Sequence, residues 1–136
     1  MRYFLIMSIC LFMLGCSNEK PDRNYFIGIW KANDGAKIEF YINGKCKASG
    51  LNHYSIHPFE KYKNQILNFE GNWTFENDKL HLSYPQGETK QTTSGFDLLI
   101  TGQGLLENTP PWDLYLFLGD PDDIDDSNKY IFIKQE

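Results

Sequence analysis

The sequence predicts an all-β fold, a small antiparallel up-and-down barrel of about eight strands that follows a signal peptide. Apolar residues recur with a period of two along much of residues 25–136, most clearly at Ile38, Phe40 and Ile42. No stretch of that range has the apolar spacing of an amphipathic helix. An antiparallel sandwich is the alternative, and a closed barrel is favoured because closure leaves no exposed strand edges.

Turn residues divide this pattern into short strands. Asn43-Gly44 is the strongest hairpin signal, because both positions of a tight two-residue turn need positive φ. On the strand after that turn, we expect Cys46 and Ala48 to face the interior. The expected strands are residues 26–31, 36–42, 45–49, 65–69, 72–75, 80–84, 96–101, 112–118 and 129–134. Residues 50–64 are expected to form a loop with one short helical turn, 85–95 a polar loop and 119–128 an acidic turn.

The first 16 residues have the features of an export signal. Arg2 is followed by an apolar run that is too short for a membrane-spanning helix, which needs about 20 such residues. The run ends in Met13-Leu14-Gly15-Cys16, which resembles the bacterial lipobox. The resemblance implies cleavage before Cys16 and attachment of diacylglycerol to this cysteine, with acyl chains such as palmitate. An ordinary secretory signal cleaved near Gly15 is the alternative.

Three segments follow from this interpretation. Residues 1–15 are the lipoprotein signal peptide, 16–24 the lipidated N-terminus with a flexible polar tether, and 25–136 the β-barrel domain. The expected location is the cell envelope, with the lipid anchor on the non-cytoplasmic side. Ser17 would imply the outer membrane, facing the periplasm, if the host has two membranes.

Charge and cysteine content exclude several classes of partner. The net charge is −5, and it becomes about −6 once Arg2 leaves with the leader, which disfavours nucleic acid and anionic lipid head groups. Cys46 is the one thiol that remains after Cys10 is removed and Cys16 is modified. We therefore expect no internal disulfide and a buried, unreactive Cys46.

Two groups of residues resemble a known kind of protein. The segment from Gly28 to Lys31 (Gly-Ile-Trp-Lys), the later Asp34-Gly35-Ala36 and Asn43-Gly44 resemble the opening of uncharacterised bacterial lipoproteins with a small lipocalin-like barrel domain. Near the end, Leu118-Gly119-Asp120-Pro121-Asp122, followed by Lys129-Tyr130-Ile131-Phe132, resembles their terminal hairpin. The resemblance implies a lipocalin/calycin-like barrel. In lipocalins the tryptophan packs on a late-strand Arg; here the available cations for Trp30 are Lys129 and Lys134.

Two motifs suggest metal ions, but in each case the simpler reading is favoured. His53 and His57 are four residues apart, with His81 and Cys46 elsewhere, yet the adjacent Pro58 argues against a regular helix, and exposed loop histidines are the expectation. An acidic cluster could bind Ca²⁺, but it lacks the EF-hand spacing and reads as a solvated turn. Its members are Asp120, Asp122, Asp123, Asp125 and Asp126. We expect neither a metal nor a cofactor.

Aromatic residues on strands are the candidates for ligand binding. They are Trp30, Phe40, Trp73, Phe75 and Tyr115; the alternative is that they only fill the core. Residues 112–118 are apolar on both faces, so one face needs cover from a loop or a partner.

No catalytic motif accompanies these aromatic residues. The sequence has no Gly-x-Ser-x-Gly, no phosphate-binding glycine loop and no Cys-x-x-Cys, so we expect no enzyme. The expected function is a non-catalytic binding module for a small apolar ligand or an envelope protein. The alternative is a protective, immunity-type or inhibitory lipoprotein that contacts its partner through an acidic face.

Overall fold

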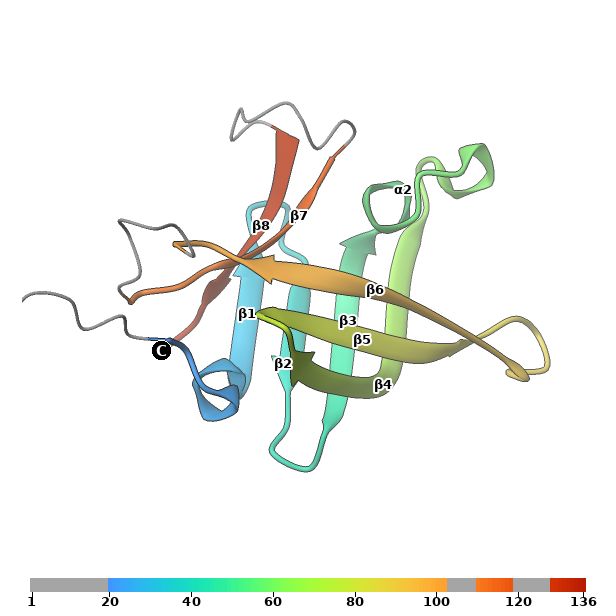
Figure 1. The fold of residues 1–136 in the computed structure, drawn as a ribbon. Coiled ribbons are helices and arrows are strands. Elements are labelled where there is room, and N and C mark those ends of the chain that lie inside the picture. The colour runs from blue at the N-terminus through green and yellow to red at the C-terminus, as the bar shows by residue number, and fades with distance from the viewer. Residues whose placement is uncertain (1–19, 103–109, 119–127) are drawn as a thin grey trace, which may run out of the picture.

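A computed structural model describes residues 20–102, 110–118 and 128–136, and in them eight antiparallel strands close into a barrel. Each strand pairs with the next along the chain, and the last pairs with the first (Figure 1). The predicted all-β, up-and-down barrel is therefore confirmed. The strands are β1 (Gly28–Ala32), β2 (Lys37–Phe40), β3 (Lys45–Asn52), β4 (Ile66–Glu76), β5 (Lys79–Gln86), β6 (Thr92–Ile100), β7 (Leu114–Phe117) and β8 (Lys129–Lys134).

Three short helical turns accompany the strands in the described part of the chain: η2 (Arg23–Phe26), α2 (His53–Ile56) and η3 (Glu60–Tyr62). The first strand was expected to begin at Phe26, but that residue ends η2, and β1 begins at Gly28. Asp22 caps η2 by accepting a hydrogen bond from the Tyr25 amide at 3.1 Å. This turn therefore includes Arg23 and Asn24, two residues that were assigned to the tether.

The β2–β3 and β4–β5 hairpins have different turns. Asn77 and Asp78 both have positive φ and join β4 to β5 as a two-residue turn. At the first hairpin only Gly44 has positive φ, and the turn is longer: the Gly44 amide donates to the Tyr41 carbonyl at 3.1 Å. The strand expected to reach residue 42 therefore ends at Phe40. Ile42, expected to alternate inward, is 72% exposed.

One long strand, β4, replaces the two short strands predicted at 65–69 and 72–75. Its first part pairs with β3 as far as Asn72, and from Asn72 onward it pairs with β5. Gly71 makes this bend possible, because a Cβ there would lie 2.1 Å from the Ser83 carbonyl oxygen.

The loop expected at 85–95 is also shorter than predicted. Strand β5 extends to Gln86, and β6 begins at Thr92. Pro85 pairs with Thr93 and lies beyond Ser83, the last β5 residue paired with β4. A residue without an N–H is tolerated there because no β4 residue needs it.

Large side chains fill the interior of the barrel. Trp30 is fully buried, and its indole Nε1 donates to the Phe26 carbonyl at 2.9 Å. Cys46 and Ala48 are buried as predicted. The largest fully buried side chains are Trp30, Phe26, Phe40, Phe132, Ile38, Leu51, Leu80, Leu82, Leu98 and Leu114.

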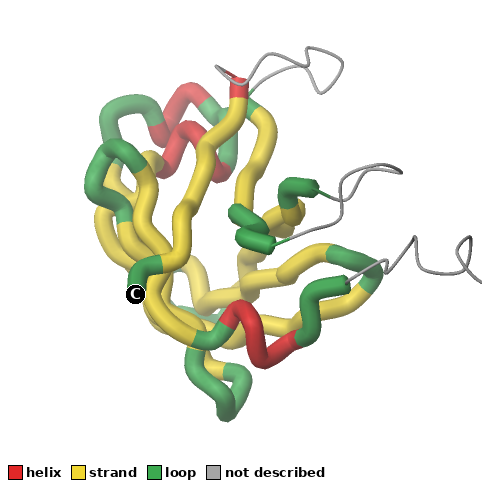
Figure 2. The backbone as a smooth tube through the Cα atoms, turned by 90° about the vertical axis from the view of Figure 1, so that its left-hand side faces the viewer, coloured by secondary structure: helices red, strands yellow, loops and turns green. Residues whose placement is uncertain are grey.

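The barrel has two distinct ends, which β3 connects. At one end, η2 lies against the β2–β3 hairpin, whose loop projects from the body in both ribbon views (Figures 1 and 2). At the other end, β3 runs directly into α2. We call these the hairpin end and the α2 end.

Candidate functional site

The barrel wall is uneven around β6. Eight residue pairs join β6 to β5, whereas two pairs, Leu99↔Tyr115 and Ile100↔Leu114, join it to β7. Beyond these pairs the two strands part, and β7 remains paired with β8. In the described residues, this is the wall where the ladder is shortest.

A groove of about 550 Å³ opens at this place, between α2, β6 and β7. We call it the rim groove. Phe96 and Leu116 pack against the core and form its apolar floor. Its volume lies within the range of about 300–1,000 Å³ that is typical of small-molecule sites. The lining residues are Tyr54, Ser55, Ile56, Pro58, Phe96, Asp97, Leu116, Phe117 and Leu118.

Asp97 is the one carboxylate in the groove lining. It accepts a hydrogen bond from His81 Nδ1 at 2.6 Å, and Lys79 Nζ lies 3.3 Å away. Burial acts to raise the pKa of Asp97, but these two donors outweigh it and hold the pKa below its usual value. The groove therefore carries an anionic group at its edge in neutral solution.

A histidine cluster lies under α2, next to the groove. The His53 ring stacks on Tyr62 with 3.7 Å between ring centroids, and His57 Nε2 is 2.7 Å from the Tyr84 hydroxyl and 3.4 Å from Ser94 Oγ. The expectation of exposed histidines was wrong for His53, which is 8% exposed and whose Nε2 has no hydrogen-bond partner among the described residues. Burial lowers the pKa of both histidines.

The histidines do not assemble with the other side chains considered for a metal. His81 is hydrogen-bonded to Asp97, and Cys46 lies in the core. In residues 20–102, 110–118 and 128–136, no three His, Cys, Asp or Glu side chains are grouped so as to hold a metal ion.

The five aromatic residues predicted to bind a ligand lie elsewhere. Trp30, Phe40 and Trp73 are at most 2% exposed and belong to the core. Phe75 packs against Phe26 at 5.2 Å between centroids, and Tyr115 is half-buried beside Phe117. None of the five lines the rim groove.

Residues 112–118, the segment that was expected to need cover on one face, supply part of the groove lining. Its first residue, Trp112, is covered internally: the ring lies 5.0 Å from the Tyr25 ring, and the amide donates to the Tyr25 hydroxyl. Its last residues, Leu116, Phe117 and Leu118, line the groove instead. Phe96 and α2 were missed, because their part in the groove depends on how distant strands meet.

Neither of the two lysines suggested as a cation partner of Trp30 lies over its ring in the contacts described. Lys134 pairs with Trp30 in the β1–β8 register; its ammonium lies 4.6 Å above the Tyr25 ring and donates to the Tyr25 carbonyl. The other suggested cation, Lys129, lies over Tyr115. Arg23 lies 4.4 Å above the Trp73 ring.

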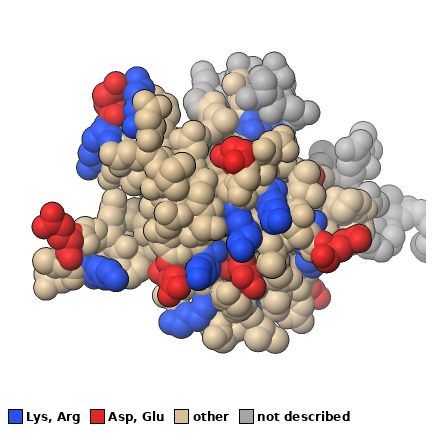
Figure 3. All heavy atoms as spheres, turned by 180° about the vertical axis from the view of Figure 1, so that it is seen from behind, with Lys and Arg blue, Asp and Glu red and all other residues tan. Residues whose placement is uncertain are grey.

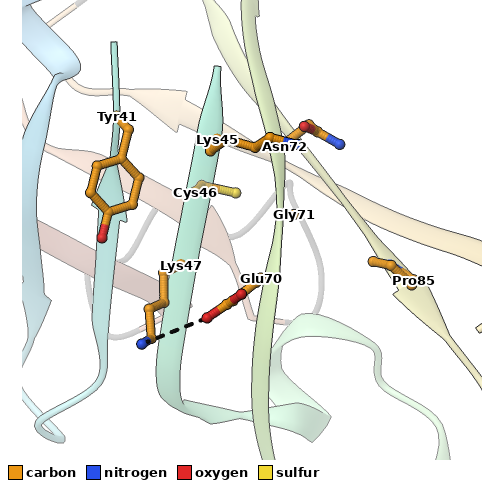
Figure 4. Close-up of a pocket in the computed structure, with 8 residues that line it drawn as sticks. All are labelled: Tyr41, Lys45, Cys46, Lys47, Glu70, Gly71, Asn72 and Pro85. Atoms are coloured by element: carbon orange, nitrogen blue, oxygen red, sulfur yellow. Dashed lines mark ion pairs between the residues drawn. The ribbon is translucent and has the colours of Figure 1, made fainter. Parts of the chain in front are cut away.

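A second surface cavity, of about 460 Å³, lies on the outer wall where β4 leaves β3 for β5 (Figure 4). Polar side chains dominate it, and Lys47 and Glu70 form an ion pair across it at 3.7 Å. Burial raises the pKa of the Cys46 thiol to about 11, so this cysteine stays protonated near neutral pH. Neither property favours this cavity over the rim groove as a binding site.

The charge on the back of the molecule is mixed. Figure 3 shows lysine and acidic side chains interspersed there, with no broad area of one sign. This face therefore gives no support to a partner held by an acidic surface.

Several predicted features lie outside the described residues. They are the signal peptide, Cys16, the tether up to residue 19 and the acidic cluster Asp120, Asp122, Asp123, Asp125 and Asp126.

Comparison with known proteins gave no match: no family model, curated protein or solved structure matches this chain. Among the described residues, none of the helices has the length and apolar character needed to cross a bilayer.

Proposed function

We propose that this chain is a bacterial lipoprotein, anchored in the cell envelope through acylated Cys16, whose barrel is a non-catalytic binding module. The observation that carries the proposal is the rim groove of about 550 Å³, with its apolar floor, at the place where β6 and β7 part. Its occupant is either a small apolar ligand or an apolar segment of another envelope protein.

The packing supports a site at the rim rather than a central one. Trp30, Phe40 and Leu98 occupy the interior with at most 1% exposure. Apolar groups in the groove would instead contact Phe96 and Leu116, which remain half-buried in the absence of a partner. Burying such surface is the main source of affinity for an apolar ligand.

The polar side chains near the groove support binding rather than catalysis. Ser94 lies 3.4 Å from His57 Nε2, but that nitrogen makes its shorter contact, 2.7 Å, with the Tyr84 hydroxyl. The histidine that contacts a carboxylate is a different one, His81. A nucleophile activated by an oriented base needs both contacts on the same histidine.

Binding of a fluorescent fatty acid, dansyl-undecanoic acid, tests the groove. Leu116→Asp places a charge in the apolar floor and should weaken binding by about ten-fold or more. Ile133→Asp is the matched control, because Ile133 is 49% exposed on β8 and does not line the groove. Near-ultraviolet circular dichroism checks that both variants fold. Equal binding by the two variants would contradict the proposed site.

Native mass spectrometry separates the two kinds of occupant. For this measurement, the domain is purified from its own host in a form that lacks the lipid anchor. A co-purifying small molecule supports a ligand, and a co-purifying polypeptide that is lost in Leu116→Asp supports a protein partner. Replacing Cys16 with Ser tests the anchor: metabolic labelling with palmitate should mark the natural chain and not the Ser variant.

A further inference from the structure

We propose that the tip of the β2–β3 hairpin, residues 41–45, touches the bilayer that holds Cys16, with Ile42 inserted among the lipid head groups. The inference rests on the proposed function, because it requires the acyl anchor at Cys16. It commits to the lipid surface as the occupant of this tip.

The hairpin tip and the start of the folded domain form one continuous surface. The Arg23 guanidinium lies 4.4 Å above the Trp73 ring, and the indole of Trp73 donates to the Tyr41 carbonyl at 2.9 Å. The Trp73 amide donates to the Gly44 carbonyl at 2.8 Å. The tip is therefore fixed beside η2, where the tether enters the domain (Figure 1).

The length of the tether places this surface near the membrane. Arg23 is the seventh residue after Cys16, and a fully extended chain over those seven steps spans at most about 25 Å. The α2 end is farther away by the length of β3, whose eight residues extend about 26 Å. The bilayer therefore meets the hairpin end more readily than the α2 end.

The chemistry of the tip suits a shallow apolar contact. At 72% exposure, Ile42 is the most exposed large hydrophobic residue in the described part of the chain, and its neighbour Tyr41 is 39% exposed. An apolar side chain beside a tyrosine is typical of segments that enter the head-group region, because tyrosine offers both an apolar ring and a polar hydroxyl. Strand alternation predicted that Ile42 would face the interior, but the turn from Tyr41 to Gly44 leaves its side chain exposed.

Charge has a small part in this contact. Arg23 and Lys45 flank the tip, but the chain after the leader is acidic overall, about −6. The contact should therefore persist in about 0.5 M NaCl, at which attraction between exposed charges is screened.

A competing apolar surface exists at the α2 end, where Tyr54, Phe59 and Ile66 are 38%, 60% and 63% exposed. If that surface met the bilayer, the rim groove would be pressed against lipid. With the hairpin end at the membrane, the groove opens toward the aqueous side, where a soluble ligand or a partner protein can reach it.

The test uses the full acylated lipoprotein in vesicles of phosphatidylethanolamine and phosphatidylglycerol in a ratio of about 3:1. A fluorescent acrylodan label is attached at Ile42→Cys or, as the matched control, at Ile66→Cys, another exposed isoleucine. Cys46 should not be labelled, because it is 2% exposed and its pKa is raised to about 11. Head-group-region doxyl lipids should quench the label at position 42 about three-fold more than the label at position 66, in low and high salt.

The outcomes are distinct. Equal quenching at the two positions, or stronger quenching at position 66, overturns the docking of the hairpin while leaving the anchor and the groove standing. If the natural chain does not float with the vesicles, the anchor of the proposed function is wrong, and the docking is overturned with it. As a second check, with the label at Asn43→Cys, Ile42→Asp should at least halve the quenching and Ile66→Asp should not change it.

Discussion

Strand β6 is joined to its two neighbours, β5 and β7, by ladders of very different length. On its β5 side, eight residue pairs run from Lys79↔Leu99 to Gln86↔Thr92; on its β7 side, two pairs close the barrel. Gly95 is tightly enclosed on the first side, while Phe96 and Leu116 border an open groove on the second. The barrel is thus closed well enough to bury a core, and its pairing is shortest where the rim groove opens.

The largest expected effect is the difference in stability between two leucine-to-alanine variants, one in the core and one at the groove. Leu98 is fully buried on β6, so Leu98→Ala should lower the free energy of unfolding by about 3 kcal/mol. Leu116→Ala, at the open groove, should lower it by about 1 kcal/mol, because the side chain is only half-buried. Urea denaturation measures both. Equal losses would mean that the groove is packed as tightly as the core.

The closed side can be tested separately at Gly95. A Cβ at this position would lie 2.6 Å from the Leu82 carbonyl oxygen, a backbone atom that cannot turn aside. Gly95→Ala should therefore destabilise the protein by about 2 kcal/mol, measured by the same denaturation. A loss below about 0.5 kcal/mol would show that β5 and β6 separate easily, and the comparison would fail.

A smaller effect is expected where β8 closes against β1. The Lys134 ammonium donates to the Tyr25 carbonyl and lies above its ring, so Lys134→Gln should cost about 1 kcal/mol. Lys31→Gln, at an exposed position of β1, is the control and should change stability by less than about 0.5 kcal/mol. A similar loss in both variants would mean that the Tyr25 contact adds nothing.

The smallest expected effect is a dependence on pH at the α2 side of the groove. Burial lowers the pKa of His53 and His57 in the folded protein, so below about pH 6.5 the unfolded chain binds more protons. Stability should therefore fall as the pH is lowered from 7 toward 5. His53→Phe, which keeps a ring against Tyr62, should reduce this slope in denaturation curves recorded across that range. An unchanged slope would show that His53 does not contribute.

The sequence was sufficient for the barrel and insufficient for the groove, for identifiable reasons. Period-two alternation correctly predicted that Cys46 and Ala48 face the interior. It also indicated that the segment around Leu116 has more apolar side chains than one core-facing side needs. Alternation reports which side of a strand faces the core, so it holds wherever the strand is regular. It failed at Ile42, because the turn begins two residues earlier than the pattern suggested.

The predicted ligand residues illustrate a different limit. Trp30, Phe40 and Trp73 have the correct inward phase, but phase does not reveal whether a barrel interior is filled. The position of the groove depends on the short pairing of β6 with β7 and on the placement of α2 beside these strands. Both arise from contacts between segments distant in sequence, which local patterns do not encode.

The most direct test of the binding site is a two-dimensional NMR titration of the protein with dansyl-undecanoic acid. The account predicts amide shifts concentrated at residues 54–56, 96–97 and 116–118, which line the rim groove. It predicts little change at the outer face of β1 to β3. Shifts centred on that outer face, or no saturable shifts at all, would contradict the assignment of the groove as the binding site.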